Sequence, residues 1–215
     1  MGYHVPYLEN LMIKAILWDF DGVILDSMKV KGDGFVELFK EYDREYTLLL
    51  EKYHYENGGV SRFEKIKYFY NTILEKEVSE NEINVLANKF SSIIEAGLFK
   101  KKNIIQETVD YIIDDYKKYN FHIVSGAEHN ELNTLCDFFS ITKYFLSIEG
   151  SPIKKKSLIK NILEKFNYKN EETILIGDSI NDYNAALSNN IKFYGYNNNE
   201  LKKFAYIETF KDFKL

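Results

Sequence analysis

The stretch Lys14-Ala15-Ile16-Leu17-Trp18-Asp19-Phe20-Asp21-Gly22 decides the fold. Lys14 to Phe20 is a short apolar run closed by a glycine, which is typical of a buried strand that stops abruptly. Because side chains alternate between the faces of a strand, Asp19 and Asp21 point the same way. Two neighbouring carboxylates repel each other unless a cation or a shared proton relieves the repulsion. The pair suggests a site for a phosphate group and a metal ion, although a strand followed by an Asp-Gly turn gives the same pattern.

The composition limits the classes of protein that the chain can belong to. Its 215 residues fit one large domain, or a core domain with a smaller insert, and 45% of them are apolar. A net charge of −5 without a basic stripe argues against a nucleic-acid partner. The single cysteine, Cys136, excludes an internal disulfide and favours a reducing, cytoplasmic location. Neither a membrane span nor a signal peptide in the first eleven residues is expected.

Strand and helix patterns alternate along most of the chain. This alternation predicts an α/β fold, a doubly wound and mostly parallel Rossmann-like sheet whose ligands bind beyond the carboxyl ends of the strands. The further predicted strands are Phe121–Val124, Tyr144–Ile148, Thr173–Ile176 and Ile191–Tyr194, and the predicted helices are Thr108–Tyr119, Glu128–Phe139, Ile153–Phe166 and Ile180–Asn189.

Residues 27–102 show no strand pattern. Met28–Tyr42 is amphipathic, and two capping boxes, Ser61–Glu64 and Ser79–Glu82, open further helices. We therefore predict an all-helical cap domain over 27–102, inserted after the first strand. Residues 1–26 and 103–215 would form the catalytic core.

Three further polar motifs fall at predicted strand ends or helix starts. Ser125-Gly126 follows a strand, and its hydroxyl either donates to a phosphate oxygen or caps the next helix. Ser151-Pro152 is typical of a helix start. Lys155 then lies on the apolar face of that helix, where it requires an anionic partner such as phosphate unless it extends to solvent.

The third motif is Gly177-Asp178, with Asp182 four residues later. Asp178 directly follows a buried strand and is interpreted as a metal ligand. Asp182 could simply be the third residue of a helix capped by Ser179. A ligand set made only of oxygen atoms favours Mg²⁺.

The order of these motifs, from Ile13 to about Tyr196, resembles the haloacid dehalogenase-like superfamily. The resemblance implies that Asp19 is the nucleophile that forms an aspartyl-phosphate, and that Asp21 is the general acid and later the base. It also implies that Asp21 carries a raised pKa. The dehalogenase branch lacks this second acid, so the phosphatase branch is favoured.

The same resemblance assigns the remaining site residues. Ser125, Gly126 and Lys155 would hold the transferring phosphoryl group. Asp178 would bind Mg²⁺ together with Asp19 and the backbone carbonyl of Asp21, and Asp182 would be a supporting acid. The helical insert would be a cap of the family's first type.

The predicted cap contains a glycine loop, Asn57–Arg62, that resembles the cap loop of β-phosphoglucomutase-like members. The resemblance implies that Gly59, Ser61 and Arg62 contact the substrate, whereas a turn followed by a capping box would explain the same residues structurally.

We expect a Mg²⁺-dependent phosphatase for a small phosphorylated metabolite, either a phosphosugar or a phosphorylated small acid. A sugar phosphomutase is the main alternative. Two features count against it: those enzymes usually have adjacent acids where this chain has Gly177-Asp178, and a proline directly after the lysine, whereas Pro152 precedes Lys155. A receiver-like or non-catalytic phosphate-binding protein is a weaker alternative. The sequence does not specify the oligomeric state.

Overall fold

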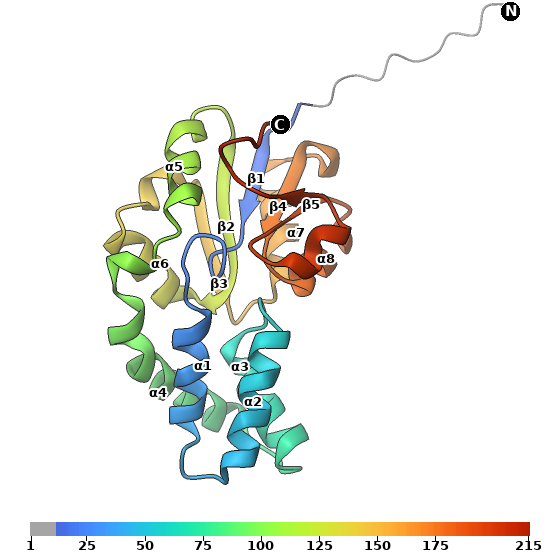
Figure 1. Cartoon of the computed structure of the whole chain (residues 1–215). Helices are drawn as coiled ribbons and strands as arrows, with labels where there is room; N and C mark the ends of the chain where they lie inside the picture. The colour runs from blue at the N-terminus through green and yellow to red at the C-terminus, as the bar shows by residue number, and fades with distance from the viewer. Residues whose placement is uncertain (1–11) are drawn as a thin grey trace, which may run out of the picture.

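A single parallel sheet organises the protein, as the computed structural model of residues 12–215 shows (Figure 1). Its six strands lie in the order β3-β2-β1-β4-β5-β6, and every pairing is parallel. The predicted α/β fold class is confirmed. The strands are β1 (Ala15–Trp18), β2 (Asn120–Glu128), β3 (Ser147–Ser151), β4 (Thr173–Gly177), β5 (Lys192–Tyr196) and β6 (Tyr206–Ile207).

Helices cover both faces of this sheet. On one face, Leu17, Val124 and Leu175 pack in a cluster with residues of α7 (Lys155–Phe166) and α8 (Ile180–Leu187). The alternate side chains, including Ile16 and Trp18, face α5 (Gln106–Asp115), α6 (His129–Phe138) and the C-terminal segment. Because it is covered on both sides, β1 is fully buried along its length, as expected for a central parallel strand.

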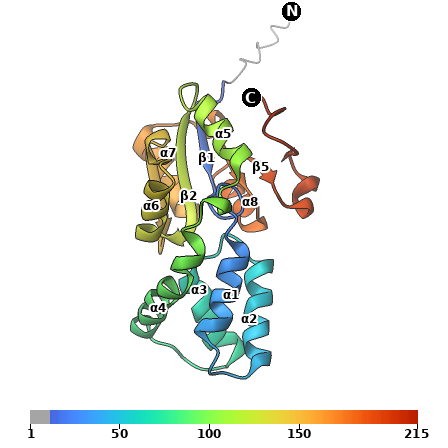
Figure 2. The same cartoon turned by 60° about the vertical axis from the view of Figure 1, so that its left-hand side comes forward.

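Four α-helices lie beyond the carboxyl ends of the strands: α1 (Met28–Leu38), α2 (Arg44–Glu56), α3 (Arg62–Tyr68) and α4 (Glu80–Leu98) (Figures 1 and 2). Stacked aromatic rings hold them together, with Phe35 on Phe90 at a centroid distance of 4.3 Å. We call residues 27–102 the cap and the remaining described residues the core. The exact division between two domains stays a prediction.

The cap joins the core where two segments of the chain run side by side. Leu25, on the way into the cap, forms an isolated bridge with Ile104 on the way out. Within residues 12–215, no helix has the length and apolar character needed to cross a bilayer. The expectation that residues 1–11 are not a signal peptide concerns residues outside the described part.

Several predicted boundaries were wrong because tertiary contacts extend the strands. β2 does not end at Val124, before Ser125, but continues to Glu128, which pairs with Ser151 of β3. Accordingly, Glu128 rather than Ser125 caps α6, accepting from the Glu131 N–H at 2.8 Å. β3 begins at Ser147 instead of Tyr144, because Tyr144 is the last residue of a 3₁₀ turn, Thr142–Tyr144.

The helix predicted from Ser151 begins only at Lys155. Ser151 is the last residue of β3, and its hydroxyl donates to the carbonyl of Ala127 at 3.0 Å instead of capping a helix. In the cap, α1 ends at Leu38 instead of Tyr42. The capping box at Ser79 is confirmed, and the Ser61 hydroxyl accepts from the Glu64 N–H as an N-cap.

Candidate active site

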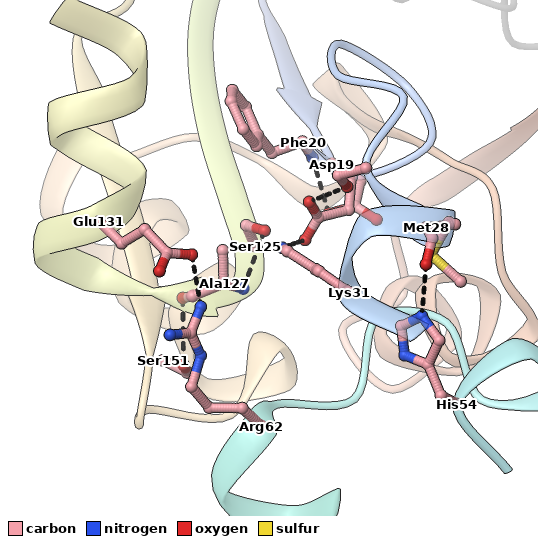
Figure 3. Close-up of polar contacts among 12 residues, drawn as sticks. Asp19, Phe20, Met28, Lys31, His54, Arg62, Ser125, Ala127, Glu131 and Ser151 are labelled. Carbon is pink, nitrogen blue, oxygen red and sulfur yellow. Dashed lines mark hydrogen bonds and ion pairs between the residues drawn. The ribbon is translucent and has the colours of Figure 1, made fainter. Parts of the chain in front are cut away.

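Asp19 lies directly beyond β1, at the centre of the sheet's carboxyl edge. Its N–H donates to the carbonyl of Ile176 at 2.9 Å, which continues the alignment of β1 with β4. Its Oδ1 accepts from the Phe20 N–H at 2.7 Å (Figure 3). The same oxygen pairs with Lys155 Nζ, also at 2.7 Å. The side chain is 1% exposed, and Oδ2 is buried without a hydrogen-bond partner in the described part of the chain. A buried carboxylate oxygen is rarely left unpaired, so Oδ2 is suited to accept a bound cation.

Asp178 reaches the same point from the end of β4. Oxygen atoms of Asp19, Asp178 and Asp182 all lie within 4.8 Å of one another. Gly22 makes this approach possible: it has a φ of 76°, and a Cβ there would lie 1.9 Å from Asp178 Oδ2. The glycine that closes the Asp-x-Asp motif is therefore required by an acid 156 positions further along the chain.

Two asparagines that sequence reasoning missed support this edge of the site. Asn198 Nδ2 donates to the carbonyl of Asp178 at 2.8 Å, and Asn197 Nδ2 donates to the carbonyl of Gly22 at 2.9 Å. The turn after β5 therefore fixes the backbone that carries Asp178. No motif in the sequence marks this turn.

Asp182 is both a helix-capping residue and an acid of the site, the two roles that the sequence left open. Its carboxylate completes a capping box with Ser179 at the start of α8, and it also pairs with Lys155 Nζ. Burial alone would lower the pKa of Lys155, but Asp182 and Asp19 outweigh burial and raise it. Lys155 is therefore a permanent cation between two acids.

One lysine does not neutralise the cluster of acids. Burial, followed by the charge of Asp182, raises the pKa of Asp19 to about 7. Burial and the nearby Asp19 also raise the pKa of Asp178 well above its usual range. An additional cation would relieve both effects. The carboxylates and the unpaired Oδ2 of Asp19 fit Mg²⁺, which prefers oxygen ligands.

Ser125 and Gly126 lie on β2, beside Asp19. Ser125 is fully buried, and its Oγ accepts from the Ala127 N–H at 3.1 Å, so its own proton remains available for a ligand (Figure 3). Gly126 is in close contact with the cap, because a Cβ there would lie 2.3 Å from the carbonyl oxygen of Gly59. The cap loop therefore rests directly on this strand.

The environment of Asp21 contradicts the expected pKa. Burial alone would raise it, but the charge of Lys31 and hydrogen bonds from Lys31 and Ser27 outweigh burial and lower the pKa of Asp21. Lys31 Nζ lies 2.5 Å from Asp21 Oδ2, and Ser27 Oγ donates to Oδ1. The prediction of a raised pKa was wrong because it considered the neighbouring acids and not the lysine supplied by α1.

Arg62 connects the cap to the core. Its guanidinium pairs with Glu131 of α6 (Figure 3). It also donates to Ser91 Oγ at 2.5 Å and lies over the Phe90 ring. In this arrangement Arg62 is buried and its charge is already compensated. Its predicted contact with substrate, like those of Gly59 and Ser61, stays a prediction.

Further polar contacts hold the cap loop over the site. Asn181 Nδ2 donates to the carbonyl of Gly58 at 2.8 Å, and Lys154 pairs with Glu64 at 2.8 Å. A crevice of about 230 Å³ remains between this loop and the core, and both Gly126 and Lys155 line it. Phosphate-sized ligands therefore have a route to the predicted phosphate-binding residues.

Three basic residues of the cap were missed: Lys31, His54 and Lys65. All three are buried, and they line a small cavity together with Asp21. The signal that singled out Lys155 was present for both lysines. Lys31 lies four residues before the buried Phe35, and Lys65 lies four before the buried Phe69, each on the apolar face of its helix.

A family model described as haloacid dehalogenase-like hydrolase matches residues 16–196. The chain belongs to this family. Comparison with curated proteins gives no match.

Several solved structures share the fold of this family member. β-Phosphoglucomutase from Clostridium difficile is 21% identical with a TM-score of 0.75, covering 95% of this chain and 94% of its own. A predicted phosphoglycolate phosphatase from Haemophilus somnus is 17% identical with a TM-score of 0.70, covering 93% and 96%. A CbbY variant from Rhodobacter sphaeroides, solved with xylulose-(1,5)-bisphosphate, is 17% identical with a TM-score of 0.72, covering 94% and 96%.

Proposed function

We propose that this hydrolase is a Mg²⁺-dependent phosphatase that cleaves a small phosphate monoester through an aspartyl-phosphate on Asp19. The observation that carries the proposal is the buried carboxylate of Asp19, whose Oδ2 has no hydrogen-bond partner among residues 12–215. Its Oδ1 pairs with Lys155, and one of its two oxygens lies within 4.8 Å of an Asp178 oxygen. A carboxylate is a competent nucleophile when it is ionised and held in place.

Asp19, Asp178 and the backbone carbonyl of Asp21 would hold the metal ion. When bound, Mg²⁺ supplies positive charge that stabilises the transferring phosphoryl group and the ionised form of Asp19. Asp182 supports the site by keeping Lys155 in position.

The chain's own residues then have distinct tasks. Ser125, Gly126 and Lys155 bind the phosphoryl oxygens and orient phosphorus in line with the Asp19 carboxylate. In the first step, a bond forms between Asp19 and phosphorus while the ester P–O bond breaks. In the second step, water attacks phosphorus and the bond to Asp19 breaks, which regenerates the carboxylate.

Asp21 would transfer the proton in both steps. Its ionised form, which Lys31 and Ser27 favour, is suited to accept a proton from the attacking water. In the first step Asp21 would donate a proton to the leaving oxygen, and the ion pair with Lys31 opposes that protonation in the ligand-free protein.

The proposed substrate is a phosphosugar or a phosphorylated small acid, with Gly59, Ser61 and Arg62 of the cap near the leaving group. The lone cysteine supports a cytoplasmic location, which stays a prediction.

Phosphate release from a panel of small esters tests the function. We expect turnover that requires Mg²⁺, stops with EDTA and falls to background in Asp19→Asn. Asp212→Asn removes an exposed acid from the C-terminal segment and serves as the matched control. Turnover that persists in Asp19→Asn would remove Asp19 from its role. Conversion of a sugar phosphate into its isomer without phosphate release would instead identify a phosphomutase.

A further inference from the structure

A small cavity lies between the cap and the core beside Asp21. Its volume is about 30 Å³, and its polar lining includes Asp21 from the core and Lys31, His54 and Lys65 from the cap. The cavity also shares Gly59 and Gly126 with the open crevice that leads to Lys155. The cavity therefore lies next to the crevice, at the point where the cap loop touches β2.

Lys65 is the unusual residue of this lining. Its side chain is 3% exposed, and no carboxylate of residues 12–215 lies within ion-pair distance of its Nζ. Its hydrogen bond goes to Nδ1 of His54, at 2.9 Å. A buried ammonium without an anionic partner costs several kcal/mol, so such a group is expected where a ligand supplies the anion.

His54 fixes the orientation of Lys65. His54 Nε2 lies 2.9 Å from the carbonyl of Met28, which can only accept, so Nε2 carries the proton (Figure 3). Nδ1 is therefore an acceptor for one N–H of Lys65. Burial, followed by the charge of Lys65, lowers the pKa of His54 to about 3 and keeps the ring neutral. Two N–H groups of Lys65 remain for a ligand.

The other cations of the lining already have partners. Lys31 pairs with Asp21, and Arg62 pairs with Glu131. Lys65 alone remains uncompensated, and burial followed by the charge of Lys31 lowers its pKa to about 7. An anion in the cavity would restore the ordinary protonation of Lys65 and balance the charge of the lining.

The chemistry of the reaction places the leaving group next to this cavity. Asp21 is proposed to protonate the leaving oxygen, so the atoms beyond that oxygen lie on the Asp21 side of the phosphoryl group. A cavity of about 30 Å³ has the volume that one water molecule occupies in the liquid. That space suits a carboxylate better than a second phosphate group.

We propose that Lys65, oriented by His54, binds a carboxylate on the leaving group, and that the substrate is therefore a phosphorylated small hydroxy acid. This inference rests on the proposed phosphatase function and selects one of its two substrate classes.

Two esters that differ only at the group facing Lys65 test the inference. 2-Phosphoglycolate carries a carboxylate where ethyl phosphate carries a methyl group. We expect kcat/KM to be about 10- to 100-fold higher for 2-phosphoglycolate, the factor for a charge-assisted hydrogen bond. Lys65→Met should abolish this preference by lowering kcat/KM for 2-phosphoglycolate, with ethyl phosphate changed less than about threefold. Lys67→Met, an exposed lysine of the same helix paired with Glu80, should keep the preference.

A binding measurement separates this inference from turnover. By calorimetry in the presence of Mg²⁺, 3-phosphonopropionate should bind the wild type more tightly than propylphosphonate, and Lys65→Met should remove the difference. Lys65→Gln serves as a second variant if Lys65→Met does not fold, as judged by its thermal melting curve.

Each failure has its own signature. Equal loss on both esters would show that Lys65 is only structural and would overturn the inference. A Lys65-dependent preference for 1,2-ethanediol bisphosphate over 2-phosphoglycolate would overturn the choice of carboxylate. Turnover of both esters without a preference would leave the phosphatase function intact and refute the inference. Absence of turnover together with Lys65-dependent binding of the phosphonate would refute the phosphatase function and keep the carboxylate site.

Discussion

Replacing Gly126 by alanine tests whether the site works with the cap closed. The new Cβ would lie 2.3 Å from the carbonyl oxygen of Gly59 and 2.9 Å from its carbonyl carbon. Ordinary contacts begin at 3.4 Å, so the cap loop must retreat by about 1 Å. Gly126 itself does not have a positive φ, and so the substitution acts through this contact alone.

A displacement of that size has a large effect on positioning. A misplacement of about 1 Å at a reacting centre can lower the rate about 100-fold. We therefore expect Gly126→Ala to lower kcat/KM for the best ester by about 100-fold. The free energy of unfolding should fall by about 1–3 kcal/mol at most, the usual cost of overpacking, because the loop can move away from the strand.

The assay compares steady-state hydrolysis with chemical denaturation in Gly126→Ala and in Gly97→Ala. The control introduces a similar clash inside the cap, where a Cβ at Gly97 would lie 2.6 Å from Val30 Cγ1. Gly97→Ala should lose stability but keep kcat/KM within about threefold of wild type. If Gly126→Ala hydrolyses the ester as fast as wild type, turnover does not need the cap loop on this strand.

Three further predictions concern charge. Because the pKa of Asp19 is raised to about 7, protons compete with Mg²⁺ for its carboxylate below pH 7. The dissociation constant of Mg²⁺, measured by calorimetry, should therefore rise by up to about tenfold for each unit of decreasing pH. A constant affinity for Mg²⁺ between pH 5 and 7 would contradict this. For the same reason, the free energy of unfolding of the metal-free protein should fall as pH rises from about 4 to about 7. Over this range Asp19 stays protonated in the folded protein and ionises in the unfolded chain. A free energy of unfolding, measured by chemical denaturation, that increases over this range would refute the prediction. Arg62→Met and Glu131→Gln should each lower the free energy of unfolding by about 3–5 kcal/mol, because each single change leaves a buried charge unpaired. The double variant should lose much less than the sum of the two single losses. Additive losses would show that the two side chains are not coupled.

The parts of the fold that the sequence predicts well are those set by local pattern. The apolar run before Asp19 is a central strand buried on both faces, and such strands carry the strongest signal. β6 was not predicted, because a strand of two residues has no periodicity to detect. The end of β2 was misplaced because Ser125 and Gly126 are typical of turns, while pairing with β3 extends the strand to Glu128.

In the candidate site, too, the features set by local pattern are predictable and those set by tertiary contacts are not. The acids at strand ends are predictable because parallel strands bring their carboxyl ends to one edge. The contacts from the cap are not predictable from spacing, because they depend on how the cap helices sit over the core. Lys31 is the clearest example: its contact lowers the pKa of Asp21, whereas the sequence predicted an increase. Its place on an apolar helix face was nevertheless visible beforehand.

The covalent intermediate can be observed directly by chemical trapping. Enzyme that is turning over an ester with Mg²⁺ is quenched in acid, and borohydride then reduces an aspartyl-phosphate to homoserine, which peptide mass spectrometry locates. We predict the modification at residue 19 and at no other acid of the cluster, and its absence from Asp19→Asn. Modification of Asp178 or Asp182, or steady turnover without any trapped phosphoenzyme, would contradict the proposed role of Asp19.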